Sequence, residues 1–99
     1  MKIIWSKESL RQLIEIELFI SKDSPERASK FIYKIINRCE SIKDYPYKGR
    51  IVLEFSVNEI REVFEKSYRI VYKVSEVQIE ILTVFEGHQL LSNDLVKNI

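Results

Sequence analysis

Four polar side chains in the second half of the chain are of the types that can cleave a phosphodiester bond. They are Glu54, Arg61, Arg69 and His88. Cleavage of RNA needs a base that activates a 2′-hydroxyl, a cation that stabilises the charge developing on the phosphate, and an acid for the leaving oxygen. Glu54 is the candidate base and His88 the candidate acid, while the two arginines are the candidate cations. The alternative interpretation is that Glu54 is a surface carboxylate and His88 a loop histidine facing solvent.

Metal and cofactor chemistry has little support in the residues available. One histidine and one cysteine, without an HxxxH or CxxC motif, do not make a zinc site. Two glycines leave no P-loop or dinucleotide fingerprint. A Ser-His-Asp triad is compatible with the spacing, but no nucleophile motif supports it. We therefore expect no metal and no cofactor. Cys39 cannot form an internal disulfide and lies on an apolar helical stripe, so we interpret it as a core residue.

A second candidate site is a set of cations that could bind an anion or an acidic target. Lys48 and Arg50 flank Gly49 in a short loop, and Arg61 and Arg69 follow on the predicted sheet. If the turn at residues 65–67 holds three residues, the two sheet arginines lie on the same face as near neighbours across two strands. Like charges placed side by side gain nothing for folding, so that face is expected to meet an anion. The alternative for the loop is an ordinary surface turn.

The elements that must position these residues are predicted from hydrophobic periodicity. Three strand-length runs at residues 60–64, 68–74 and 78–85 predict an antiparallel meander. One face of the meander is apolar. The second face carries Val71, Leu82 and Val84, which is more apolar than a face in contact with water should be. We therefore expect this second face to bind a partner.

The first half of the chain predicts a strand and two helices. Residues 2–5 form a short apolar strand that can join the edge of the meander. Ser6 and Ser24 are helix-capping residues, and Pro25 occupies the first position of the second helix. The first helix runs to about Ser21, and the second ends at Tyr45-Pro46. The short link between them predicts an antiparallel hairpin over the apolar face of the sheet, in an α+β fold of order β-α-α-β-β-β with a short C-terminal tail or helix at residues 90–99.

The second helix also carries a narrow stripe of cations. Its members are Arg27, Lys30, Lys34 and Arg38, which lie close together at 100° per residue. Such a stripe is usually a solvated surface. The alternative is a docking surface for an acidic protein segment or a nucleic acid.

Length and composition indicate one soluble domain spanning residues 1–99. The formal net charge is only +1, so the basic footprint typical of nucleic-acid-binding proteins is absent. No apolar run reaches the roughly 20 residues of a membrane span. The first residues do not resemble a signal peptide. We expect a cytoplasmic protein that does not bind membranes.

Several short motifs, in order, resemble the RelE/ParE superfamily of bacterial toxins. They are SPERA (24–28), PYKGRIVLEF (46–55), IRE (60–62), YRIVY (68–72) and EILTVFEG (80–87). The resemblance covers nearly the whole chain and implies the toxin of a type II toxin–antitoxin module. Its partner would be a cognate antitoxin protein, bound by the basic stripe and the second sheet face in a hetero-oligomer.

The resemblance also implies two modes of action. Arg69 matches the arginine of the YR motif used by RNA-cleaving members, but Gly87-His88-Gln89 stands where many of them have an arginine. The pattern is closer to the ParE-like branch, whose members poison DNA gyrase. The alternatives are a ribosome-dependent mRNA endonuclease, which makes the ribosome and mRNA the partners, and a binding module of the same fold without toxicity.

Overall fold

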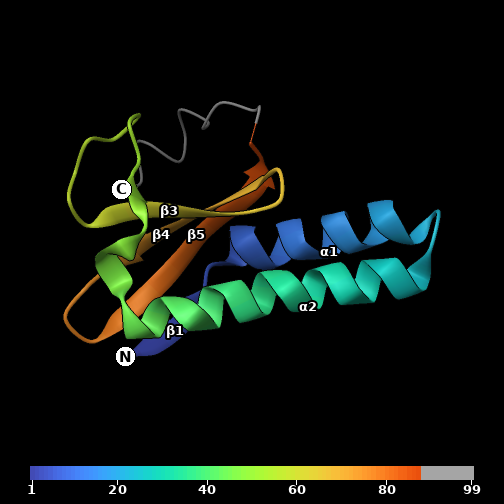
Figure 1. The fold of residues 1–99 in the computed structure, drawn as a ribbon, viewed down its shortest axis with the longest axis horizontal. Helices are drawn as coiled ribbons and strands as arrows, with labels where there is room; N and C mark the ends of the chain where they lie inside the picture. The colour runs from blue at the N-terminus through green and yellow to red at the C-terminus, as the bar shows by residue number, and fades with distance from the viewer. Residues whose placement is uncertain (88–99) are drawn as a thin grey trace.

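In the part of the chain that the structure describes, five strands form one sheet in the order β1-β5-β4-β3-β2 (Figure 1). The computed structural model describes residues 1–87. β1 pairs in parallel with β5, and the other neighbours pair antiparallel. The strands are β1 (Lys2–Trp5), β2 (Arg50–Ile51), β3 (Ile60–Glu65), β4 (Tyr68–Val74) and β5 (Gln78–Glu86). The predicted meander and the edge position of the first strand are confirmed. β2 is a further strand of two residues that the sequence did not predict.

Two antiparallel helices cover one face of this sheet (Figure 1). In α1 (Lys7–Ser21), the Ser6 hydroxyl oxygen accepts a hydrogen bond from the Ser9 amide at 3.0 Å, and the Ser6 hydroxyl donates to the Leu82 carbonyl at 2.9 Å. The capping serine therefore also fixes the start of α1 against β5. In α2 (Pro25–Ser41), the Ser24 hydroxyl accepts from the Arg27 amide. Both predicted caps are confirmed.

The second helix ends earlier than the sequence predicts. Regular α-helix stops at Ser41, and two 3₁₀ turns, Ile42–Asp44 and Pro46–Lys48, carry the chain to β2. Tyr45 separates the two turns with φ −144° and ψ 75°, outside helical geometry, as expected for a residue before proline. The break before proline lies where predicted, but the regular α-helix has already ended at Ser41, and a second 3₁₀ turn begins at Pro46.

The sheet separates two apolar clusters. The larger lies under the helices and includes Ile35 and Cys39 of α2 with Ile70 and Tyr72 of β4, all without solvent exposure. The smaller lies on the opposite face and contains Val52, Ile60, Val71, Leu82 and Phe85. The segment between β2 and β3 runs over this opposite face in Figure 1. The sheet is therefore covered on both sides.

A β-bulge in β5 changes which side chains face the helices. Val71 pairs with Thr83 and Tyr72 pairs with Ile81, so Leu82 is the extra residue. After the bulge, the positions of β5 whose side chains face the helices are shifted by one residue relative to strict alternation. Val84 therefore lies in the cluster under the helices, not on the predicted second face, and Phe85 lies in the opposite cluster.

Candidate functional site

The buried polar centre of the molecule is a network of four charged side chains on the sheet face opposite the helices. Arg69 of β4 is only 8% exposed. Its Nε and Nη2 donate to Glu62 Oε2 at 2.9 and 2.6 Å, and its Nη1 and Nη2 donate to the two oxygens of Glu54 at 3.0 and 3.1 Å. Arg50 Nη2 donates to the other Glu62 oxygen at 2.9 Å. The guanidinium of Arg69 also lies over the Phe85 ring, 5.2 Å from its centroid. We call Arg50, Glu62, Arg69 and Glu54 the ion network.

The ion network contradicts the expectation that Arg69 reaches an open surface. Two arginines and two glutamates compensate one another, and the Arg69 guanidinium is occupied on both sides. Hydrogen bonding from Arg69 is the main cause that holds the pKa of Glu54 below its ordinary value. A carboxylate with a lowered pKa is a weaker general base. In this conformation two of the candidate catalytic residues, Glu54 and Arg69, make structural contacts.

Arg61 lies on the other face of the sheet, so the prediction that it neighbours Arg69 is wrong. The register pairs Phe64 with Arg69 and Arg61 with Tyr72, because the turn between β3 and β4 holds two residues and not three. The Arg61 side chain donates to the carbonyl oxygens of Tyr47 and Gly49, each at 3.0 Å. It also donates to the Asn58 carbonyl at 2.8 Å. Arg61 therefore holds two loops together at the edge of the sheet.

The predicted partner-binding face is closed by the protein itself. Val71 has no solvent exposure and Leu82 is 8% exposed, because Val52 and Phe55 pack over them. Val84 is 1% exposed and lies under the helices. The sequence pattern correctly indicated that this face must be covered. It did not indicate that the segment after β2 provides the cover.

The basic stripe of α2 is exposed along its whole length. Its residues Arg27, Lys30, Lys34 and Arg38 are all accessible to solvent. The first three line a groove of about 410 Å³ together with Phe31 and Tyr68. Lys30 forms an ion pair with Glu26 at 3.1 Å. The stripe is thus available to a partner. Arg38, at the end of the stripe, does not line this groove but a second hollow.

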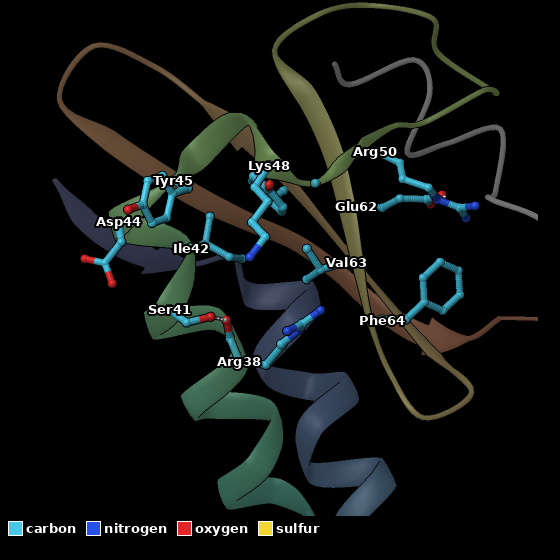
Figure 2. A pocket seen from close by; sticks show the side chains of 12 residues that line it. Arg38, Ser41, Ile42, Asp44, Tyr45, Lys48, Arg50, Glu62, Val63 and Phe64 are labelled. Atoms are coloured by element: carbon cyan, nitrogen blue, oxygen red, sulfur yellow. Dashed lines mark hydrogen bonds and ion pairs between the residues drawn. The ribbon is translucent and has the colours of Figure 1, made fainter.

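That hollow is a basic pocket of about 570 Å³ between the end of α2, the 3₁₀ turns and β3 (Figure 2). Three cations from three segments line it: Arg38, Lys48 and Arg50. The sequence paired Lys48 with Arg50 as candidate anion-binding residues, and the structure brings them to one pocket. The sequence did not indicate that Arg38 joins them. Helical periodicity assigns Arg38 to the basic stripe and gives no sign that the chain turns back beside it.

His88 lies outside the described residues. Within residues 1–87, no group of three or more His, Cys, Asp or Glu side chains could hold a metal ion. The same part of the chain contains no helix long and apolar enough to cross a membrane. Burial raises the pKa of Cys39 to about 12, which keeps it a thiol, so it is a core residue and a poor nucleophile.

The ion network predicts a pH-dependent contribution of Glu54 to stability. Because its pKa is lowered in the folded state, ionised Glu54 stabilises the fold above its unfolded pKa of roughly 4.3, and this contribution is lost as the pH falls through the folded value. We therefore expect Glu54→Gln to lower the free energy of unfolding at pH 7 and to have a shrinking effect below about pH 4. Urea titrations from pH 7 to pH 3 measure this, with the exposed, ion-paired Glu40→Gln as the control. A difference that does not depend on pH would show that Glu54 is not stabilised as an anion.

Comparison with known proteins agrees with the resemblance seen in the sequence. The model of the family described as "ParE toxin of type II toxin-antitoxin system, parDE" matches residues 3–91. The protein named "Putative toxin Y4kP" of Sinorhizobium fredii is 34% identical over 88 residues, which is 89% of this chain and 90% of that protein. A solved structure titled "Chromosomal ParDE TA system from P. aeruginosa" superposes with a TM-score of 0.73 at 20% identity, covering 87% of this chain and 95% of that one, and so shares the fold. The chain belongs to the ParE toxin family of type II toxin–antitoxin systems.

Proposed function

We propose that this protein is the growth-inhibiting toxin of a type II toxin–antitoxin pair and that it acts in the cytoplasm by poisoning DNA gyrase. Membership of the ParE toxin family over residues 3–91 is the observation that carries the proposal. The ion network adds support, because it engages Arg69 and Glu54 in structural contacts and leaves a nuclease without its cation and base. A poison that binds its target requires a surface and no free catalytic groups.

We further propose that the antitoxin docks on the helical hairpin. Three large apolar side chains of α1, spaced four residues apart, are exposed: Leu10 at 48%, Ile14 at 59% and Leu18 at 60%. They form an apolar stripe on α1, while the basic stripe lies on α2. An antitoxin segment that is disordered on its own and rich in leucines and acidic residues would complement both stripes when it folds on the toxin.

Growth in a bacterial host tests the toxin assignment. Induced expression of this chain alone is expected to stop growth, and co-expression of the small protein encoded beside it is expected to restore growth. The antitoxin titrates the toxin by mass action, so the rescue should follow the ratio of the two proteins. Normal growth with confirmed soluble expression of the chain would contradict the proposal without contradicting the fold.

The basic stripe makes a prediction about how fast the antitoxin associates. Reversing the charge at Lys30 and Lys34, as Lys30→Glu/Lys34→Glu, should slow association about tenfold or more at low salt and flatten its salt dependence, because steering by opposite charge is lost. Stopped-flow or surface-immobilised binding measures the rate. Lys43→Glu/Lys73→Glu makes the same change in net charge away from the middle of the stripe and is the matched control. An unchanged association rate would show that the stripe is only solvated surface.

A further inference from the structure

The basic pocket at the end of α2 carries positive charge that its own walls do not neutralise. Arg38 and Lys48 form no ion pair within the described residues, whereas Arg50 is paired with Glu62, which also accepts from Arg69. Asp44 lines the pocket, but Figure 2 shows its carboxylate pointing away from the other side chains. In the same view the Lys48 ammonium and the Arg38 guanidinium point into one space beside Ile42 and Val63. That space is suited to an anion.

The neighbouring strand adds a neutral hydrogen-bond donor. The Ile60 carbonyl of β3 accepts a hydrogen bond from the Val52 amide, on the side of β3 where β2 lies. Every second residue of β3, counted from Ile60, directs its N–H and C=O groups to that same side. Phe64 is one of these residues. β2 pairs only with Arg61 and Glu62, and no strand of the described chain pairs with Phe64 on that side. The Phe64 N–H is therefore directed to the edge where the pocket lies.

The rest of the pocket is apolar and large. Ile42 and Val63 line its inner wall, and Tyr45, whose side chain is 70% exposed, stands at its rim. Its volume of about 570 Å³ lies within the range of roughly 300 to 1,000 Å³ typical of small-molecule sites. A lone inorganic anion would leave most of this space and its apolar wall unused.

We propose that the basic pocket binds a nucleoside phosphate. The phosphate would accept from Arg38, Lys48 and the Phe64 amide, and it offers more acceptor oxygens than a carboxylate does. The sugar and base would cover Ile42 and Val63, with Tyr45 available to stack on the base. The ligand is either a free nucleotide or one nucleotide within a strand. This site shares only Arg38 with the proposed antitoxin surface, and binding of a nucleotide here does not depend on an antitoxin.

Calorimetric titration of the purified full-length chain tests the proposal with four probes: AMP, a ten-nucleotide single-stranded DNA, inorganic phosphate and a glutamate-rich decapeptide. AMP or the DNA is expected to bind at least about tenfold more tightly than phosphate or the peptide, because only these two use both the cations and the apolar wall. Tighter binding of AMP identifies a free nucleotide as the ligand, and tighter binding of the DNA identifies a nucleotide within a strand.

Two variants connect that binding to the pocket. Arg38→Gln/Lys48→Gln should weaken it about tenfold to a hundredfold, and Lys22→Gln/Lys73→Gln, with the same loss of charge away from the pocket, should change it less than about twofold. Tyr45→Ala should weaken binding of the nucleotide but not of phosphate. All of these side chains are exposed, so thermal unfolding should show that the variants fold. Equal affinity for phosphate and the nucleotides, tighter binding of the peptide, or an unchanged Arg38→Gln/Lys48→Gln variant would each overturn the proposal.

Discussion

Replacing Arg69 by alanine is expected to lower the free energy of unfolding by about 3 to 5 kcal/mol, because it leaves a buried charge without its partner. The Glu62 side chain is only 5% exposed and would keep one contact, to the largely exposed Arg50. Glu54, 31% exposed, would lose both of its hydrogen bonds from Arg69. Urea denaturation at pH 7 measures the change. If the face that carries Arg69 were open, the same substitution would cost only within about 0.5 kcal/mol.

Arg11 provides the matched control for this prediction. It pairs with Glu8 and Glu15, and its side chain is 55% exposed. Exposed ion pairs contribute little, so Arg11→Ala should leave stability almost unchanged although it also removes two carboxylate contacts. The double variant Arg69→Met/Glu62→Gln, which removes both buried charges, should be more stable than Arg69→Ala. A loss below about 1 kcal/mol for Arg69→Ala would show that the ion network is not structurally important.

The Arg69 result also affects how toxicity data are interpreted. A variant destabilised by several kcal/mol loses toxicity through unfolding and degradation, whatever its chemical role. Loss of toxicity in Arg69→Ala is therefore not a sign of catalysis unless the soluble, folded fraction is measured as well. Arg69→Met/Glu62→Gln separates the two interpretations, because it lacks the guanidinium but is expected to retain more of the fold.

Replacing Gly49 by alanine is expected to destabilise the protein by about 1 to 3 kcal/mol or more, through overpacking. Gly49 has φ −65°, which any residue can adopt, so its requirement is for space. An added Cβ would lie against the Tyr72 hydroxyl and 2.7 Å from the Glu62 carbonyl oxygen. Neither atom moves easily, since the Tyr72 hydroxyl donates to the Pro46 carbonyl at 2.7 Å and the Glu62 oxygen belongs to the backbone of β3.

A second substitution shows which contact dominates. In Gly49→Ala/Tyr72→Phe the hydroxyl is gone but the backbone oxygen remains, so stability should recover only in part relative to Gly49→Ala. Ser29→Ala, on the exposed side of α2, is the control and should stay within about 0.5 kcal/mol. Thermal and urea unfolding measure all the variants. Wild-type stability of Gly49→Ala would contradict the close approach of the loop to the sheet.

The parts of the fold that the sequence predicted are those with a strong local signal. Capping serines, proline at the start of α2 and helical periodicity located both helices, and β-branched and aromatic runs located β3, β4 and β5 to within about a residue. Each of these signals lies within the element that it describes. The same local logic correctly placed Cys39 in the core.

The parts that it missed depend on pairings between distant segments. Arg69 is neutralised by Glu54, which lies 15 residues earlier, and that contact requires the segment after β2 to fold over the sheet. The bulge at Leu82 and the two-residue turn before Tyr68 each shift alternation by one residue, which is enough to move a side chain to the other face. The basic pocket joins Arg38 and Lys48 through two 3₁₀ turns whose geometry periodicity does not reveal.

The most direct test of the proposed function is a supercoiling and DNA-cleavage assay with purified DNA gyrase and the purified chain. We expect the chain to inhibit supercoiling and to cause cleaved DNA to accumulate, and we expect the adjacent antitoxin to suppress both effects. His88→Ala should behave like the unaltered chain, because a protein that poisons gyrase by binding it does not need an acid catalyst. Unaffected gyrase, together with ribosome-dependent cuts in mRNA that disappear in His88→Ala, would contradict the account and identify the protein as an endonuclease.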